Sequence, residues 1–513
     1  MAIDSLTNNT AINSNSALQD AAQSIINGAT GKSNLDVDGL VAVLVKGKTA
    51  GLNVAISAAT TRNNDLSAAF GRLRNELTSL QTALTSLSDG TLQQKFAVNA
   101  SGKGLTATTE KGATAGSYQV EVKQVANSQT LVSSAFDPKQ KLGTGTMTLK
   151  VGDKSMQLDV TPENNTPAGI AAAINASQKN PGVTATIVNG TDGAHLVLRT
   201  VASGSANVIN IDVSNVKDDG GLSKFAVQSV VDPKGGPSKV MDGAHTWTQS
   251  KDAAAQDAIV SVGGITARHA DNAMKDVIAG VTLNVTQEAL GSTQTLTISP
   301  DIDAQAKVVT DFVAQYNSVM KTAAAFSTFD KTAAKGQQGG ILLGDQTLNA
   351  IRNSLGKIMA GGVDNGTAKA GFAEIGVKFA PLGSNLPDGS LVVDNAALKA
   401  ALQNKPAVVA RVFNETDGLG KQMSNQINLH IRDDGTKLTD KGTIAVRLSA
   451  IDTDMKSLSQ RGKQLELYTS QLTTQYKSQF TALDALMAKM KTNGDYLTAL
   501  FGGQNSAGAL ANK

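Results

Sequence analysis

Residues 52–87 read LNVAISAATTRNNDLSAAFGRLRNELTSLQTALTSL, and this stretch decides the fold. Its apolar side chains recur at heptad spacing on two rows, and Asn63 interrupts one of the rows. A repeat of about 3.5 residues sustained over this many turns predicts a long helix that packs as a coiled coil. The side chains that we expect to form its contact surface are Leu66, Phe70, Leu73, Leu77, Leu80 and Leu84.

A second stretch with the same spacing lies between Leu448 and Met490, near the other end of the chain. Fully burying one Leu side chain contributes about 1.5 to 3 kcal/mol, so two such stripes are strongly driven to meet. We therefore expect the chain ends to pack against each other or against neighbouring subunits, although amphipathic helices on a globular core would show the same spacing. The expected contact side chains of the second helix are Leu458, Leu465, Leu472, Leu483 and Leu486.

The middle of the chain has a different pattern. All 10 prolines lie between Pro138 and Pro406, and proline breaks long helices. A short helix is expected at residues 167–176, where Pro stands at the start, and loops are expected at 214–256. Alternation with a period of two predicts strands within residues 118–122, 147–160, 183–198 and 260–298. The sequence thus predicts an α+β multidomain fold in which long terminal helices form coiled-coil or helical-bundle legs, with two β-rich domains inserted between them.

These patterns suggest where the domains begin and end. Residues 1–50 are expected to be disordered or to form a helical leg segment, and residues 446–513 to form a C-terminal coiled-coil leg. The remaining expected parts are a helical-bundle domain from residues 51–100 and 300–445, an inner β-rich domain from 101–137 and 253–299, and an outer β-rich domain from 138–252.

The composition argues against several classes of function. The 46 basic and 43 acidic residues leave a formal net charge of +3, too little for a strongly basic nucleic-acid or membrane surface. The chain has no cysteine, and its 4 histidines show no metal-ligand spacing. The longest apolar run, Gly39–Val45, is far shorter than the roughly 20 residues that span a bilayer. We therefore predict no enzyme activity, no cofactor, no metal, no nucleic-acid partner and no membrane span.

The stretch YKSQFTALDALMAKMKTNGDYLTALF, Tyr476–Phe501, carries a Leu-Asp-x-Leu-Met core and a Tyr-Leu ending. It resembles the terminal helix of one family, the flagellar filament capping proteins, also called hook-associated protein 2. Residues 144–198 are similar to a small module of flagellins and hook-associated proteins. Further segments that resemble the family, in order, are Leu35–Gly47, Gly116–Leu131, Gly344–Leu355, Phe372–Val377 and Asp388–Leu402.

The resemblance implies a structural cap at the distal tip of the bacterial flagellar filament, which retains exported flagellin and promotes its folding and polymerisation. It implies a homo-oligomeric ring, a pentamer, with flagellin, the hook-filament junction proteins and a flagellar export chaperone as partners. It also implies type III export to an extracellular site, for which a chain without cysteine is suited. Two alternatives stay open: a secreted adhesin that binds host glycans or mucin, and another hook-associated axial protein.

Overall fold

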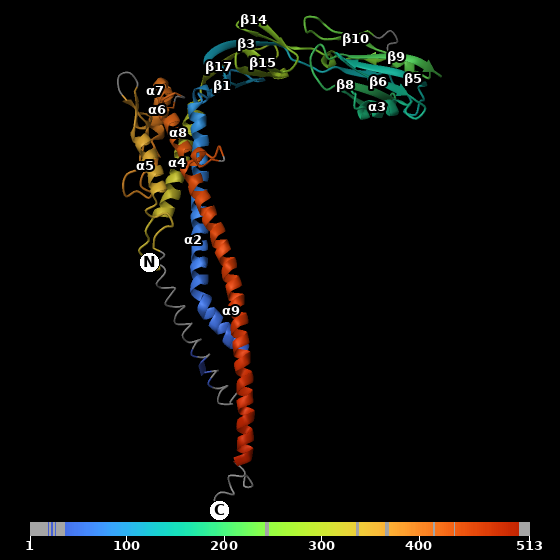
Figure 1. Cartoon of the computed structure of the whole chain (residues 1–513). Helices are drawn as coiled ribbons and strands as arrows, with labels where there is room; N and C mark the ends of the chain where they lie inside the picture. The colour runs from blue at the N-terminus through green and yellow to red at the C-terminus, as the bar shows by residue number, and fades with distance from the viewer. Residues whose placement is uncertain are drawn as a thin grey trace, which may run out of the picture. The chain divides into compact units, whose positions relative to one another are not determined.

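The computed structural model describes residues 36–501 apart from 242–245, 335–337, 365–368, 414–415 and 436, together with the single positions 19, 22, 23 and 26. The chain divides into two compact units, whose elements are labelled in Figure 1. The helical unit consists of Met1–Asp89 and Ala306–Lys513, and the β unit is Gly90–Gln305. Both parts of the chain that flank the β unit therefore belong to one unit.

Two long helices dominate the helical unit, α2 (Val37–Ser88) and α9 (Thr443–Phe501). Neither contains proline, and Asp36 caps α2 because its Oδ1 accepts a hydrogen bond from Gly39 N–H at 2.9 Å. The shorter helices are α4 (Ile302–Ser327), α5 (Gln346–Ala360), α6 (Asn395–Asn404), α7 (Pro406–Phe413) and α8 (Leu419–Ile431). The short strands form two antiparallel pairs, β18 (Val363–Asp364) with β19 (Lys369–Ala370) and β20 (Val377–Phe379) with β21 (Leu391–Val393).

Aromatic rings from three parts of the helical unit meet in its core. Phe312 of α4 stacks on Phe372 with 5.8 Å between the ring centroids, and Phe413 of α7 meets Phe372 edge-on at 5.6 Å. Such aromatic pairs contribute about 0.5 to 1.5 kcal/mol beyond their buried area. All three rings are fully buried, so they hold the shorter helices together.

The helix α2 begins well before the first clear heptad position at Leu52. It starts at Val37 and runs without a break through residue 50. Val41 and Val45 are buried against α9 there, so packing extends the helix beyond the clear heptads. The division of the two units into smaller domains stays a prediction.

By length and composition, α2 is the one helix of the described residues that could cross a membrane. A helix in the core of a protein passes the same test, so this property is weak evidence for a span. The absence of a membrane span stays a prediction.

One part of the β unit has two sheets, with strand orders β1-β17-β3-β13-β14 and β15-β16-β2. All the described pairs in them are antiparallel. Val120 and Val122 of β3 are fully buried, while the residues between and beside them are more exposed, as the alternation predicted. The strands are β1 (Phe96–Ala100), β2 (Leu105–Thr109), β3 (Gly116–Gln124), β13 (Ala258–Val262), β14 (Ile265–His269), β15 (Ala273–Ile278), β16 (Val281–Val285) and β17 (Thr293–Pro300).

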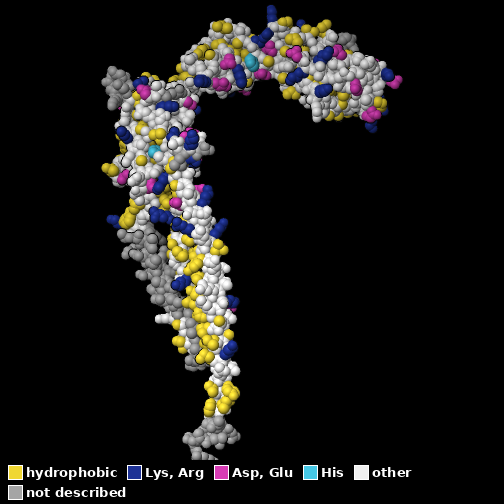
Figure 2. Space-filling view, viewed as in Figure 1, with side chains coloured by type: hydrophobic (Ala, Val, Ile, Leu, Met, Phe, Trp, Pro, Cys, Tyr) yellow, Lys and Arg dark blue, Asp and Glu magenta, His cyan; other side chains and the backbone are white. Residues whose placement is uncertain are grey.

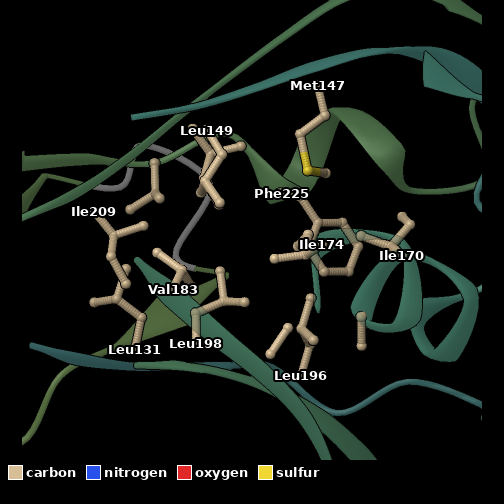
Figure 3. Packing of buried hydrophobic residues seen from close by; sticks show 14 of the residues in the cluster. Leu131, Met147, Leu149, Ile170, Ile174, Val183, Leu196, Leu198, Ile209 and Phe225 are labelled. Carbon is tan, nitrogen blue, oxygen red and sulfur yellow. The ribbon is translucent and has the colours of Figure 1, made fainter. Parts of the chain in front are cut away.

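A second part of the β unit has sheets of order β12-β4-β8-β7 and β6-β5-β9, and contains α3 (Pro167–Ala176). Figure 3 shows how Leu198, Ile174 and Phe225 point into one apolar core between these elements. Thr166 caps α3 through its Oγ1, and Pro167 stands in the first turn, so the short helix that the sequence predicted is confirmed. The strands are β4 (Thr130–Ser133), β5 (Thr144–Val151), β6 (Lys154–Val160), β7 (Val183–Asn189), β8 (Ala194–Thr200), β9 (Ile209–Lys217) and β12 (Trp247–Thr248).

The expectation of loops throughout residues 214–256 is wrong. This region holds the end of β9, the pair β10 (Gln228–Val230) with β11 (Lys239–Met241), and β12. The last three strands have only 3, 3 and 2 residues, too few to show a period of two in the sequence.

Candidate functional site on the paired terminal helices

The two long helices run antiparallel and pack side by side (Figure 1). Near the start of α2, Asp38 Oδ1 lies 2.8 Å from Lys477 Nζ in the second half of α9. In the second half of α2, the Phe70 ring lies under the guanidinium of Arg447, which is in the first turns of α9, at 5.6 Å. The prediction that the two ends of the chain pair is confirmed for α2 and for α9 as far as Met487.

From Phe70 onward, the predicted contact side chains of α2 are buried inside the helical unit. Arg74 Nη2 lies 3.3 Å from Asp433 Oδ2, and Gln81 Nε2 donates a hydrogen bond to Asn428 Oδ1 at 2.6 Å. These polar links fix the register of the helix against the segments that follow α7. The side chains with 0% exposure in this row are Phe70, Leu73, Leu77, Leu80 and Leu84. Because they are covered within one chain, they have no free surface for a neighbouring subunit.

The other predicted contact side chains lie at different depths. Leu465 and Leu472 of α9 are buried, whereas Leu486 is 55% exposed. The half-buried members of the set are Leu66, Leu458 and Leu483. Heptad spacing placed all of them on one contact surface, but the structure separates a covered part from an uncovered part. Their role in self-association stays a prediction.

An apolar groove of about 400 Å³ runs between the first half of α2 and the middle of α9. Leu52, Ile56 and Ala59 line it from α2, and Leu458 and Tyr468 line it from α9. The two helices therefore do not cover each other completely along this stretch.

Large apolar side chains remain exposed on the outside of the same helices, and Figure 2 shows them gathered along the pair. We call the following side chains the leg surface: Leu52, Leu467, Tyr468, Leu486, Met490, Tyr496, Leu497 and Phe501, which are 44% to 66% exposed. The sequence prediction of contact residues missed all of these except Leu486. On α9, the residues Leu486, Met490, Leu497 and Phe501 are separated by four, seven and four residues, which places them on one face of the helix. This spacing could have predicted the apolar stripe from the sequence.

Two histidines have environments that shift their pKa in opposite directions. In the β unit, His195 Nδ1 lies 2.7 Å from the Ser133 carbonyl oxygen, and Nε2 lies 3.0 Å from Asp192 Oδ1. Both neighbours accept hydrogen bonds, so they raise the pKa of His195. In the helical unit, burial lowers the pKa of His430, and its Nε2 has no hydrogen-bond partner among the described residues.

Within the described residues there is no group of three or more His, Cys, Asp or Glu side chains that could hold a metal ion. The prominent surface feature is instead the apolar stripe along two long paired helices. Long helices precede and follow the β unit in the sequence, and they carry an exposed apolar stripe. This arrangement is typical of a structural protein that acts by binding other proteins along extended surfaces.

Comparison with known proteins identifies the family. The family model for the N-terminus of flagellar hook-associated protein 2 matches residues 33–129, and the model for its C-terminus matches residues 255–492. The chain belongs to the flagellar hook-associated protein 2 family, whose function is to cap the flagellar filament. A filament cap acts at the filament tip, outside the cell.

The individual similarities cover most of the chain. It is 30% identical over 84% of its length to the B-type flagellar hook-associated protein 2 of Pseudomonas aeruginosa, of which 89% is covered. It is 28% identical over 91% of its length to the flagellar hook-associated protein 2 of Escherichia coli K12, of which 96% is covered. The structure of the D1-D2-D3 domains of the Escherichia coli flagellar cap protein matches 75% of the chain and 99% of that structure, with a TM-score of 0.58 at 26% identity. These matches favour the cap over another hook-associated axial protein and give no support to an adhesin.

Proposed function

We propose that several copies of the chain stand side by side at the filament tip and bind one another through the leg surface. The observation that supports this is the exposure of Leu486, Met490 and Phe501, at 55%, 66% and 59%, on a helix whose partner helix does not cover them. Contiguous exposed apolar side chains on a helix favour burial against another protein surface. A second copy carries the same stripe and the same groove, so each copy can cover its neighbour.

In this proposal the copies form a closed ring, because a contact between two different patches closes into a ring when the rotation between subunits allows it. The proposed ring is a pentamer. In this proposal the ring retains flagellin that arrives at the tip until each molecule folds and joins the filament. The cap acts through contact and without catalysis. Flagellin, the hook-filament junction proteins and a flagellar export chaperone are its further proposed partners.

The chain is proposed to reach the tip by secretion through the type III export apparatus. The absence of cysteine supports this route, because a chain exported unfolded then cannot form premature disulfides. Residues 1–50 and 446–513 serve as legs in this proposal. Residues 51–100 with 300–445 form the bundle that carries them, and residues 101–137 with 253–299 and residues 138–252 form the two β-rich domains of the cap plate.

The double variant Leu486→Ser/Met490→Ser tests the assembly. Sedimentation velocity of the wild-type chain is expected to show an oligomer, and the double variant a monomer at the same protein concentration. Its helix content by circular dichroism should match the wild type, because both side chains are more than half exposed in the single chain. The control Val201→Ser/Ile265→Ser removes two side chains of similar kind in the β unit, 76% and 77% exposed, and should assemble like the wild type.

Cells that carry each variant provide the functional readout. Loss of assembly should stop swimming and release unpolymerised flagellin into the medium, while the β-unit control should swim. If Leu486→Ser/Met490→Ser sediments like the wild type and its cells swim normally, the copies do not bind one another through the leg surface. Electron microscopy of the wild-type oligomer would count the subunits, and a number other than five would overturn the pentamer.

A further inference from the structure

The apolar groove between α2 and α9 is separate from the exposed stripe near the end of α9. Two side chains that line the groove, Leu52 and Tyr468, are 53% and 44% exposed. The stripe from Leu486 to Phe501 shares no residue with the groove. The two apolar surfaces can therefore be covered by different partners.

A short amphipathic segment precedes α2 in the sequence. Residues 17–27 read ALQDAAQSIIN, and at about 100° per residue their apolar and polar side chains fall on opposite halves of a helix. The apolar half consists of Ala17, Leu18, Ala21, Ala22, Ile25 and Ile26. The pattern ends at Asn27-Gly28, a pair that is typical of a helix C-terminus. The sequence thus predicts an amphipathic helix at residues 17–27.

The described positions of this segment agree with the prediction. The structure describes residues 19, 22, 23 and 26, and all four are helical. Gln19 and Gln23 of the polar half are exposed, and so are Ala22 and Ile26 at the border of the apolar half. The centre of the apolar half is formed by Leu18, Ala21 and Ile25. These three are the side chains for which the pattern predicts burial.

The connection between the segment and α2 is long enough to bring the segment to the groove. Ile26 and Val37 are 11 residues apart, and this stretch can span about 36 Å when extended. Leu52 lies only about 22 Å along α2 from Val37. The segment can therefore fold back antiparallel to α2 and lie on the groove.

The segment and the groove also match in length and charge. Leu18 and Ile25 are seven residues apart, as are Leu52 and Ala59 on the α2 wall, so each pair spans about 10 Å of helix. The charged side chain among the groove residues is Arg461, and the one in residues 17–27 is Asp20. The two charges have opposite signs, so they favour the approach of the segment.

We propose that residues 17–27 cover the groove between α2 and α9 of their own chain, with Leu18, Ala21 and Ile25 against its apolar walls. The occupant is the same chain because the short connection holds the segment near the groove at an effective concentration of the order of mM. The match to the family model begins at residue 33, so this contact involves a part of the chain outside the matched region. The stripe from Leu486 to Phe501 stays available to a neighbouring copy.

Paired cysteines in the full chain, which has 0 natural cysteines, test the contact. Ala22→Cys/Ala55→Cys places one thiol on the segment and one on the α2 wall of the groove. In the control Ala22→Cys/Ser57→Cys, the second thiol lies about 200° around α2 from Ala55, outside the groove. Each dilute variant is treated with a short bis-maleimide, and cross-linking within one chain is read from the mobility of the denatured monomer on a gel. We expect the groove pair to react at least ten-fold faster than the control pair.

Substitutions in the segment identify the side chains that hold it. Adding Leu18→Ser/Ile25→Ser to the groove pair should slow the cross-linking at least ten-fold, because the apolar contacts are lost. Adding Gln19→Ser/Gln23→Ser, on the polar half, should leave the rate unchanged.

Three results would overturn the proposal: equal rates for the groove pair and the control pair, no effect of Leu18→Ser/Ile25→Ser, or cross-links that join two chains instead of one. None of them bears on the stripe from Leu486 to Phe501, whose role in assembly is measured separately by sedimentation.

Discussion

Shortening one buried leucine of α2 tests whether the second half of this helix forms the core of the helical unit. Leu77 is 0% exposed, so Leu77→Ala removes buried atoms and leaves a cavity. Such changes lower the free energy of unfolding by about 2 to 5 kcal/mol. Leu52 lies on the same helix but is 53% exposed, so we expect Leu52→Ala to cost about 1 kcal/mol or less. The two substitutions change helix propensity equally, and their difference therefore measures burial.

Urea unfolding followed by circular dichroism measures both effects. With a slope of roughly 2 kcal/mol per molar urea, Leu77→Ala should lower the unfolding midpoint of the helical unit by about 1 to 2.5 M, and Leu52→Ala by about 0.5 M or less. The β unit is unchanged in both variants, so its transition provides an internal reference. Equal shifts for the two variants, or no shift for Leu77→Ala, would refute the assignment of Leu77 to the core.

Three further predictions concern polar groups that are buried or half-buried. Asp257→Asn should lower the free energy of unfolding of the β unit by about 1 to 3 kcal/mol, because the carboxylate accepts a hydrogen bond from Ser205 N–H at 2.6 Å and lies 3.4 Å from Arg268 Nε. Urea unfolding measures the effect, and Asp153→Asn, at an exposed carboxylate, is the control. Equal effects of the two substitutions would contradict the prediction. Because burial lowers the pKa of His430, the unfolded chain takes up the proton first: the stability of the helical unit should be full above pH 6.5 and decrease as the pH falls below it. Urea midpoints at several pH values check this, and His430→Gln should flatten the dependence. The Ser133 carbonyl and Asp192 raise the pKa of His195, so its contribution to the β unit should be full below pH 6.5 and be lost as the pH rises through the raised pKa. Titration of the imidazole signals should give a pKa above 6.5 that decreases in Asp192→Asn, and a wild-type value at or below 6.5 would be incompatible with the two acceptors.

Elements with local signals could be predicted from the sequence. The helix at residues 167–176 has its capping Thr166 and its Pro167 beside each other in the sequence, and α3 has the predicted bounds. Buried and more exposed side chains alternate around Val120 and Val122 because one face of their sheet packs on a hydrophobic core. In the sequence this alternation is a period of two. In both cases the residues that decide the structure are neighbours in the chain.

Elements that depend on distant partners could not be predicted. Trp247 stands in a region that was expected to form loops, yet it is buried and its indole N–H donates to the Phe225 carbonyl at 3.1 Å. Its strand β12 has 2 residues and forms because β4, far earlier in the chain, offers a free edge. A pocket of the helical unit is lined by Tyr316 of α4, Arg352 of α5 and Asp388 of a later loop, so no single stretch of sequence contains it.

The heptad spacing by itself determined that both ends of the chain form long helices, because an apolar side chain at every third or fourth position places one stripe along a helix whatever surrounds it. Only the tertiary structure decided which part of each stripe is covered. Leu77 is buried because segments from the far end of the chain fold over it, while Leu486 stays 55% exposed because α2 does not cover that face of α9. Burial depends on neighbours that are distant in sequence, so the period that predicts a stripe cannot say what lies against it.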